Sequence, residues 1–252
     1  MLSEDALRRA LERIDVDAPV RFDEVTRSTQ ETARNLAAEG SPEWTLVAAG
    51  HQTEGRGRLG RAWEDEPGRA LLFSLVLRPD LNADRGGLIS LLAGWAMATA
   101  CRDLGRDVGC KWPNDLLQNE RKVGGVLAES EIEGARFSHV VLGVGVNVGA
   151  APTDVAGAGA LGDIDEAPLL EAFLHHFAAR YEPGHPAFAG AVLEGYREVS
   201  ATIGRSVQAI TADGHLGVRG EAVDVDETGA LVVRTRTGLE AVGFGEVEHL
   251  RV

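Results

Sequence analysis

One stretch of twelve residues carries most of the side chains that could bind an anion. Residues 52–63 read Gln-Thr-Glu-Gly-Arg-Gly-Arg-Leu-Gly-Arg-Ala-Trp, with three glycines, three arginines and one tryptophan. Glycine lets the backbone approach a ligand closely, and the planar guanidinium groups of Arg56, Arg58 and Arg61 match phosphate or carboxylate oxygens. We therefore expect this stretch to be a loop that holds an anionic ligand.

Two other interpretations apply to the same stretch. Gly55, Gly57 and Gly60 satisfy the dinucleotide-binding pattern G-x-G-x-x-G. That pattern needs a helix next, and Pro67 and Gly68 stop any helix before its N-terminus could face a pyrophosphate. A solvent-exposed loop without a ligand is the other alternative, since glycine and arginine are common surface residues.

Lysine is the second signal, because Lys111 and Lys122 are the only lysines among 25 basic residues. A compact, rotatable ammonium does what a planar guanidinium cannot, which favours a chemical role for both over chance clustering. Residues 118–121 predict a hairpin turn that brings Lys111, Asp115 and Lys122 into one neighbourhood. Asp115 would there bind a magnesium ion or pair with a lysine.

The remaining sequence predicts the elements that hold these residues. We expect helices at 3–14, 31–39, 86–104, 167–182 and 186–200, and strands at 20–27, 44–53, 70–77, 108–111, 116–117, 122–129 and 137–148. Ser28 or Thr29 either caps the second helix or contacts a ligand. Gly143 and Gly145 leave room beside the last strand, and the small residues of 149–163 predict a mobile loop.

The periodicity changes at Gly204, where helical spacing gives way to short alternating runs separated by turn residues. This change predicts a small β-barrel. We therefore expect two domains, one at residues 1–203 and one at 204–252.

The composition excludes several classes of protein. A net charge of −14 argues against nucleic-acid binding and suits a salty cytoplasm, where ions screen the self-repulsion of an acidic surface. No apolar run reaches membrane-spanning length, and the N-terminus has no secretory signal. Cys101 and Cys110 lack the spacing of a metal site or disulfide framework. We therefore expect a cytoplasmic protein that binds neither membranes nor nucleic acid.

The runs 55–63, 111–115 and 122–127 together resemble the signature motifs of biotin protein ligases, in the same order and spacing, and the resemblance extends from Ser28 to the C-terminal barrel. It implies an α+β fold whose mixed, mostly antiparallel central sheet is flanked by helices, as in the class II synthetase-like catalytic domain of biotin ligases. It also implies a small C-terminal SH3-like barrel. The predicted helix at 3–14 is too short to be the DNA-binding winged helix of some members, so we expect no repressor function.

The resemblance implies an activity and its partners. Biotin and ATP would give biotinyl-5′-adenylate, with Mg²⁺ as cofactor, and the biotin would pass to a lysine of a biotin carboxyl carrier protein. A homodimer is compatible with the sequence. The alternatives are a lipoate or octanoate ligase of the same superfamily, which typically lacks the triple-arginine loop before a tryptophan, and a non-catalytic biotin-binding module.

The resemblance also implies roles for individual residues. The catalytic set would be Lys122, Arg58, Lys111 and Asp115, with Asp115 as the candidate metal ligand. The biotin-binding set would be Ser28, Thr29, Gln30, Gln52, Gly55, Arg56, Gly57, Arg58, Trp63, Lys122 and Gly124. The ATP-binding set would be Arg58, Arg61, Lys111 and Asn147.

Overall fold

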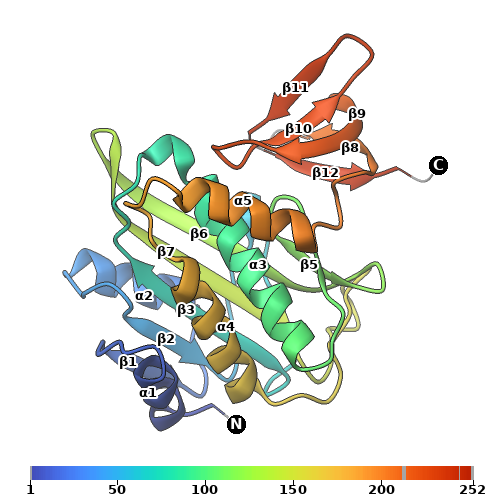
Figure 1. Ribbon diagram of the computed structural model, residues 1–252. Coiled ribbons are helices and arrows are strands. Elements are labelled where there is room, and N and C mark those ends of the chain that lie inside the picture. The colour runs from blue at the N-terminus through green and yellow to red at the C-terminus, as the bar shows by residue number, and fades with distance from the viewer. Residues whose placement is uncertain (1, 212–213, 244, 251–252) are drawn as a thin grey trace.

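The computed structural model describes residues 2–211, 214–243 and 245–250, which form a helix-covered sheet and a second, smaller sheet near the C-terminus (Figure 1). The α-helices are α1 (Glu4–Glu12), α2 (Thr29–Ala38), α3 (Gly87–Asp103), α4 (Glu166–Arg180) and α5 (Phe188–Val199). The strands of the larger sheet are β1 (Val20–Asp23), β2 (Leu46–Ala49), β3 (Ala70–Leu77), β4 (Gly109–Lys111), β5 (Asp115–Gln118), β6 (Arg121–Glu133) and β7 (Arg136–Asn147). The smaller sheet contains β8 (Ser206–Ile210), β9 (Leu216–Val225), β10 (Leu231–Arg234), β11 (Leu239–Val242) and β12 (Glu246–His249).

The seven-stranded sheet has the order β1-β2-β3-β7-β6-β5-β4. Strands β1 and β2 are parallel, whereas every other neighbouring pair is antiparallel. The smaller sheet is wholly antiparallel, in the order β11-β10-β9-β8-β12. These arrangements confirm the predicted α+β class with a mostly antiparallel central sheet.

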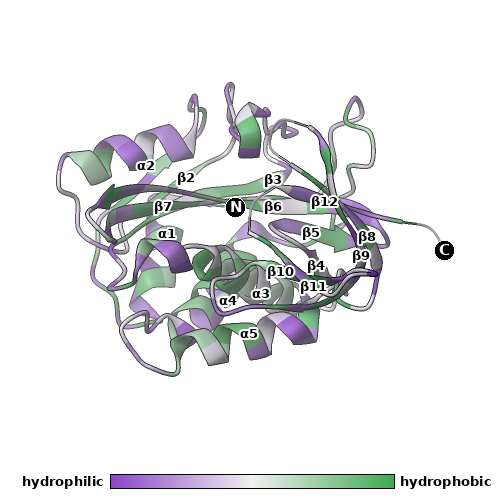
Figure 2. Cartoon of the chain, turned by 90° about the horizontal axis from the view of Figure 1, so that it is seen from above, coloured by the Kyte–Doolittle hydropathy of each residue, from purple (hydrophilic) through white to green (hydrophobic). Residues whose placement is uncertain are grey.

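Helices cover the two faces of the large sheet unequally. Helix α2 lies on one face, and α1, α3, α4 and α5 lie on the other (Figure 2). Helix α3 packs against α4, α5 and strands β4 to β6, which explains why its sequence is apolar almost all round. On the α2 face, a small cluster of Ala33, Ala37, Val47, Val76 and Val141 fills the space under the helix.

The main hydrophobic cluster continues from the large sheet into the smaller one, since it includes Leu142 and Phe73 as well as Val207 and Val247. Trp112 lies at the junction, 2% exposed, where its indole N–H donates to the carbonyl of Gly229 at 3.0 Å. The predicted division at Gly204 lies just before β8, the first strand of the smaller sheet. Because the two sheets share a hydrophobic cluster, separate folding of the two parts stays a prediction.

Local sequence signals account for the elements that were predicted best. Ser3 accepts a hydrogen bond from the backbone N–H of Ala6 and caps α1, and β3 occupies the predicted residues 70–77. The hairpin between β5 and β6 turns at Asn119 and Glu120, both with positive φ, as in tight two-residue turns. Strand β12 was not predicted.

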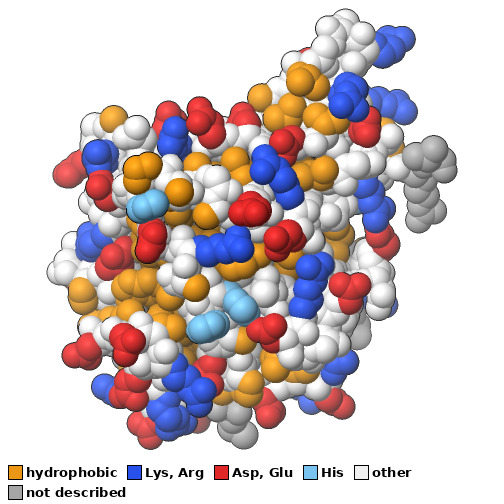
Figure 3. Space-filling model, in the orientation of Figure 1, with side chains coloured by type: hydrophobic (Ala, Val, Ile, Leu, Met, Phe, Trp, Pro, Cys, Tyr) orange, Lys and Arg blue, Asp and Glu red, His pale blue; other side chains and the backbone are white. Residues whose placement is uncertain are grey.

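The described residues include no helix long and apolar enough to cross a bilayer. On the face covered by α3, α4 and α5, acidic and basic side chains are interspersed (Figure 3). Opposite charges in this arrangement form ion pairs such as Arg197 with Asp224, 2.8 Å apart.

Candidate functional site

A cavity opens on the α2 face of the large sheet, beneath the loop that joins β2 to β3. The loop predicted to hold an anion forms one wall, and strands β3, β6 and β7 form the floor. The lining residues are Ser28, Thr29, Gln30, Gln52, Arg56, Gly57, Arg58, Arg61, Ala62, Trp63, Phe73, Ser74, Asn114, Asp115, Lys122, Gly125, Val126, Leu127, Gly143, Val144, Gly145 and Glu246. Strand β3 follows the loop without an intervening α-helix, so the dinucleotide interpretation is wrong.

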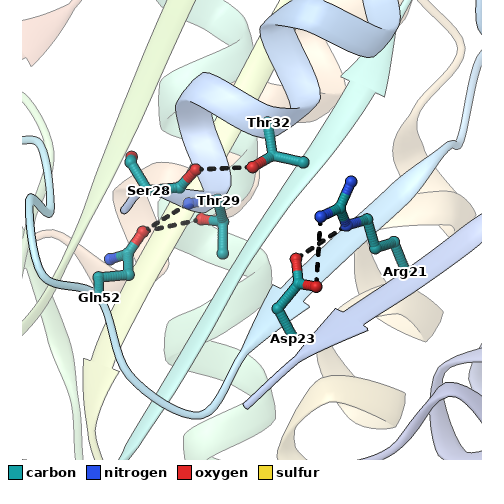
Figure 4. A network of polar contacts seen from close by, with 6 residues as sticks. All are labelled: Arg21, Asp23, Ser28, Thr29, Thr32 and Gln52. Carbon is teal, nitrogen blue, oxygen red and sulfur yellow. Dashed lines mark hydrogen bonds and ion pairs between the residues drawn. The ribbon is translucent and has the colours of Figure 1, made fainter. Parts of the chain in front are cut away.

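Buried polar side chains form one end of the cavity. The side-chain carbonyl of Gln52 accepts hydrogen bonds from the backbone N–H of Thr29 at 2.8 Å and from its hydroxyl at 3.1 Å (Figure 4). The hydroxyls of Thr29 and Ser74 are 2.9 Å apart, and Ser74 donates to Gln30 at 3.1 Å. The amide of Gln30 donates to the carbonyl of Val141 at 2.9 Å. This network fixes the side chains before any ligand arrives.

Two polar atoms at the cavity are buried without a hydrogen-bond partner in the described part of the chain, namely the hydroxyl oxygen of Ser28 and the indole nitrogen of Trp63. Ser28 stands at the N-cap position of α2, yet its side chain makes no capping hydrogen bond. Leaving a buried polar group unpaired costs about 1–3 kcal/mol. The arrangement favours a ligand contact over a helix cap for Ser28.

A lysine and a carboxylate stand at the other end. The ammonium of Lys122 lies 2.6 Å from Oδ1 of Asp115 across the β5–β6 hairpin. It also lies 5.9 Å from the centre of the Trp63 ring, within the range of a cation–π interaction. Lys122 and Asp115 are thus brought together as the hairpin predicted.

The three arginines of the loop have different surroundings. Arg56 lies 3.9 Å from Glu129. Arg58 donates to the carbonyl of Gly245 at 3.1 Å. Burial lowers the pKa of its guanidinium, although the negative charges of Glu246 and Asp115 act to raise it. Arg61 pairs with Glu246 at 2.7 Å. Both Arg58 and Arg61 therefore link the loop to the C-terminal segment.

Glycines permit the close packing of the floor. A Cβ added at Gly143 would lie 2.4 Å from the side-chain oxygen of Gln30, and one at Gly145 would lie 2.7 Å from the Trp63 ring. The room expected beside these glycines is therefore occupied by the chain's own side chains. Both neighbours are cavity-lining residues, so the glycines determine where the polar end and the tryptophan lie.

Four predicted site residues lie outside the cavity lining. Lys111 is directly opposite Asp115 in the β4–β5 pair, and its charge contributes to lowering the pKa of His249. Asn147 donates to the carbonyl of Gly159 at 3.0 Å, while its own side-chain oxygen is buried with no partner among the described residues. Gly55 and Gly124 serve close backbone packing, because an added Cβ would lie 2.3 Å from the Trp63 carbonyl and 2.8 Å from the Gly145 carbonyl, respectively.

Sequence reasoning missed Ser74 and Asn114 as lining residues. Ser74 is the one hydroxyl in the otherwise apolar strand β3, and it is fully buried, which is a detectable signal. Asn114 lies inside the 111–115 motif and donates to the carbonyl of Val126 at 2.7 Å. This bond holds the turn after Pro113 against β6.

The mixed sheet thus carries a cavity with buried polar side chains at one end and lysine and arginine side chains at the other. Comparison with known protein families identifies the family to which this chain belongs. Residues 22–147 match the Biotin/lipoate A/B protein ligase family, and residues 202–250 match the Biotin protein ligase C terminal domain. The chain therefore belongs to the biotin/lipoate A/B protein ligase family.

Relatives and solved structures support this assignment. The chain is 33% identical to the biotin--[acetyl-CoA-carboxylase] ligase of Mycobacterium tuberculosis, over 90% of this chain and 87% of that protein. It is 31% identical to the bifunctional ligase/repressor BirA of Bacillus subtilis, over 98% of this chain and 79% of that protein. The structure of the biotin protein ligase from Aquifex aeolicus in complex with biotin and ATP matches with a TM-score of 0.73 and 25% identity, over 93% of this chain and 99% of that chain.

Proposed function

We propose that this chain activates biotin with ATP to biotinyl-5′-adenylate and transfers the biotin to a lysine of a biotin carboxyl carrier protein. The observation that carries the proposal is the contrast between the two ends of the cavity. Biotin has a ureido ring with N–H donors and a carbonyl acceptor at one end and a carboxylate at the other. The buried polar side chains suit the ring, and Lys122 with the loop arginines suits the carboxylate and the nucleotide phosphates.

The polar end also separates biotin from the substrates of the related ligases. The apolar end of a lipoyl or octanoyl chain has no amide to pair with the buried hydroxyl of Ser28. A site that is built to hydrogen-bond its substrate discriminates strongly against an analogue lacking those groups, because its own polar atoms are then buried unpaired. This argument disfavours the lipoate and octanoate alternative.

The cationic end supports adenylate formation. A carboxylate oxygen of biotin attacks the α-phosphorus of ATP, and the bond to the pyrophosphate leaving group breaks. Two anions repel each other, and the charges of Lys122 and Arg58 offset that repulsion and stabilise the transition state. Arg61 and Asn147 are the further candidates for nucleotide contacts. Lys111 lies opposite Asp115 in the β4–β5 strand pair, and its positive charge would act on the nucleotide from there.

The second step passes the biotinyl group to the carrier. The amine of the acceptor lysine attacks the acyl carbon of the mixed anhydride, and AMP leaves with the former carboxylate oxygen. The chain's part in this step is to hold the anhydride and to exclude water, which would otherwise hydrolyse it.

Asp115, one of the two carboxylates that line the cavity, would be the protein ligand of a magnesium ion. The described residues contain no cluster of three or more His, Cys, Asp or Glu side chains able to hold a metal ion, and Mg²⁺ commonly takes one or two carboxylates plus substrate phosphates and water. When bound, it would neutralise phosphate charge. The same carboxylate also holds Lys122 in place.

Pyrophosphate release from ATP tests the proposal when biotin, lipoate and octanoate are compared as substrates. We expect release with biotin only, followed by labelling of a biotin carboxyl carrier protein. Equal release of pyrophosphate with lipoate would favour a lipoate ligase instead. Tight biotin binding without pyrophosphate release would identify a non-catalytic binding module.

A further inference from the structure

The loop after β7 was predicted to be mobile, but its second half is hydrogen-bonded to the site. The backbone N–H of Lys122 donates to the carbonyl of Gly157 at 2.9 Å, and the N–H of Gly159 donates to the carbonyl of Lys122 at 2.7 Å. On the other side, the side chain of Asn147 donates to the Gly159 carbonyl, and the N–H of Leu161 donates to the Asn147 carbonyl. Residues 157–161 thus bridge Lys122 and Asn147.

Arg121 makes the side-chain contact that closes this bridge. Its Nε and Nη2 atoms both donate to the carbonyl of Ala158, at 2.9 and 2.6 Å. Small residues let the segment approach: a Cβ added at Gly159 would lie only 2.8 Å from the Cβ of Arg121. Two donors from one planar group restrict the carbonyl more than a single flexible donor would.

We propose that Arg121 is a positioning residue that holds residues 157–161 closed beside Lys122, so that the loop retains the acyl-adenylate and excludes water from it. The inference rests on the proposed function for the identity of the intermediate. It assigns a role to a side chain outside the cavity lining, acting through the backbone of the loop. Closure by such a segment keeps a reactive intermediate from water.

Two variants remove the contact in different ways. Arg121→Met keeps an unbranched, mostly apolar side chain but loses both donors, and it also removes a positive charge near the site. Gly159→Ala keeps that charge and forces the segment away from the Cβ of Arg121. The matched controls are Arg21→Met, which removes an exposed arginine bound to Asp23, and Gly190→Ala in α5, where an added Cβ has no heavy atom within 4 Å.

Amide hydrogen exchange gives a readout that does not depend on activity. In Arg121→Met and in Gly159→Ala, amides of residues 157–161 should exchange about tenfold faster or more, because the segment opens more often. The controls should match the wild type. Unchanged exchange at 157–161 in both variants overturns the proposed role of Arg121, whatever the reaction of the protein is.

The ratio of ATP consumed to biotin transferred measures retention. For the wild type we expect a ratio near one, and for both variants a severalfold higher ratio with biotin affinity unchanged, because adenylate escapes and hydrolyses. Faster exchange combined with a wild-type ratio would contradict a role in retention. Absence of biotin-dependent ATP consumption in the wild type would instead refute the proposed function, while the exchange result still decides whether Arg121 holds the loop.

Discussion

Lys122 and Asp115 form an ion pair with 2.6 Å between Nζ and Oδ1, across a hairpin whose turn residues Asn119 and Glu120 both have positive φ. Asp115 is opposite Gly125 in the pairing of β5 with β6. A Cβ added at Gly125 would be 3.5 Å from Cε of Lys122. The lysine side chain therefore lies along the glycine-bearing strand toward the carboxylate. Its ammonium is in place before a substrate binds.

We predict that Lys122 cannot be replaced by arginine. Lys122→Arg keeps the charge but places a broad planar group where Asp115 and Trp63 surround a compact ammonium, and Lys122→Ala removes the charge. Each should slow pyrophosphate release about tenfold or more. Full activity in Lys122→Arg would show that the scarcity of lysine carries no chemical meaning, and Arg21→Met serves as a control for the loss of an exposed cation.

We predict that Gly143→Ala weakens biotin binding. The added Cβ would lie 2.4 Å from the Gln30 side-chain oxygen, so Gln30 must move, and the bonds that link it to Ser74 and Val141 must break or lengthen. Biotin affinity measured by calorimetry should fall about tenfold or more. Gly190→Ala is the matched control. Unchanged affinity in Gly143→Ala would show that the polar network around Gln30 does not contribute to biotin binding.

Parts of this site were readable from the sequence because each motif is a short continuous run of the chain. The loop of 52–63 and the hairpin around 118–121 depend on glycine and turn residues, whose backbone preferences act locally. Helix caps such as Ser3 act locally as well. The order and spacing of these motifs therefore indicated both the family and the neighbourhood of Lys122 and Asp115.

The parts that were missed depend on distant segments. Ser74 belongs to the site because β3 pairs with β7 and places it beside Gly143, and no local pattern reveals that register. Trp63 was predicted as a site residue, but its contact with Gly145 joins two distant segments. Strand β12 was missed because Glu246–His249 is short and charged, and it becomes a strand by pairing with β8.

We predict that Arg58→Gly still forms adenylate but releases it. Arg58 binds the Gly245 carbonyl and so ties the glycine-arginine loop to the C-terminal segment. Without this tie the loop should open more often, as lids do. Free biotinyl-adenylate measured in single-turnover reactions should rise, whereas slow formation with tight retention would assign Arg58 to the chemical step alone.

We predict an acid-sensitive contact at His249. Burial, reinforced by the charges of Lys111 and Arg205, lowers the pKa of His249 to about 4. Its Nε2 lies 3.1 Å from the hydroxyl of Thr202. An unfolded histidine titrates near 6.5, so this contribution to stability is complete above about pH 6.5 and is lost as the pH falls toward 4.

Urea unfolding at pH 7 and pH 5 measures this effect. His249→Gln keeps an acceptor for Thr202 but cannot be protonated, so the fall in unfolding midpoint between the two pH values should be smaller than in the wild type. His175→Gln, which changes an exposed histidine of α4, should behave as the wild type. An equal fall in all three proteins would exclude His249 as the source.

Finally, we predict that a chain ending at Ser200 binds biotin but loses ATP-dependent chemistry. The polar end of the cavity is formed by residues 28–30, Gln52 and Ser74, all in the larger sheet or its loops, so biotin affinity should change by less than about threefold. Arg58 and Arg61 lose their partners Gly245 and Glu246, so ATP affinity or transfer of biotin to the carrier should fall at least about tenfold. Trp112→Phe in the full chain removes the indole bond to Gly229 and part of the buried ring, and it should lower stability while keeping activity. If the truncated chain does not fold, the shared hydrophobic cluster makes one domain of the two sheets, and the division at Gly204 is wrong.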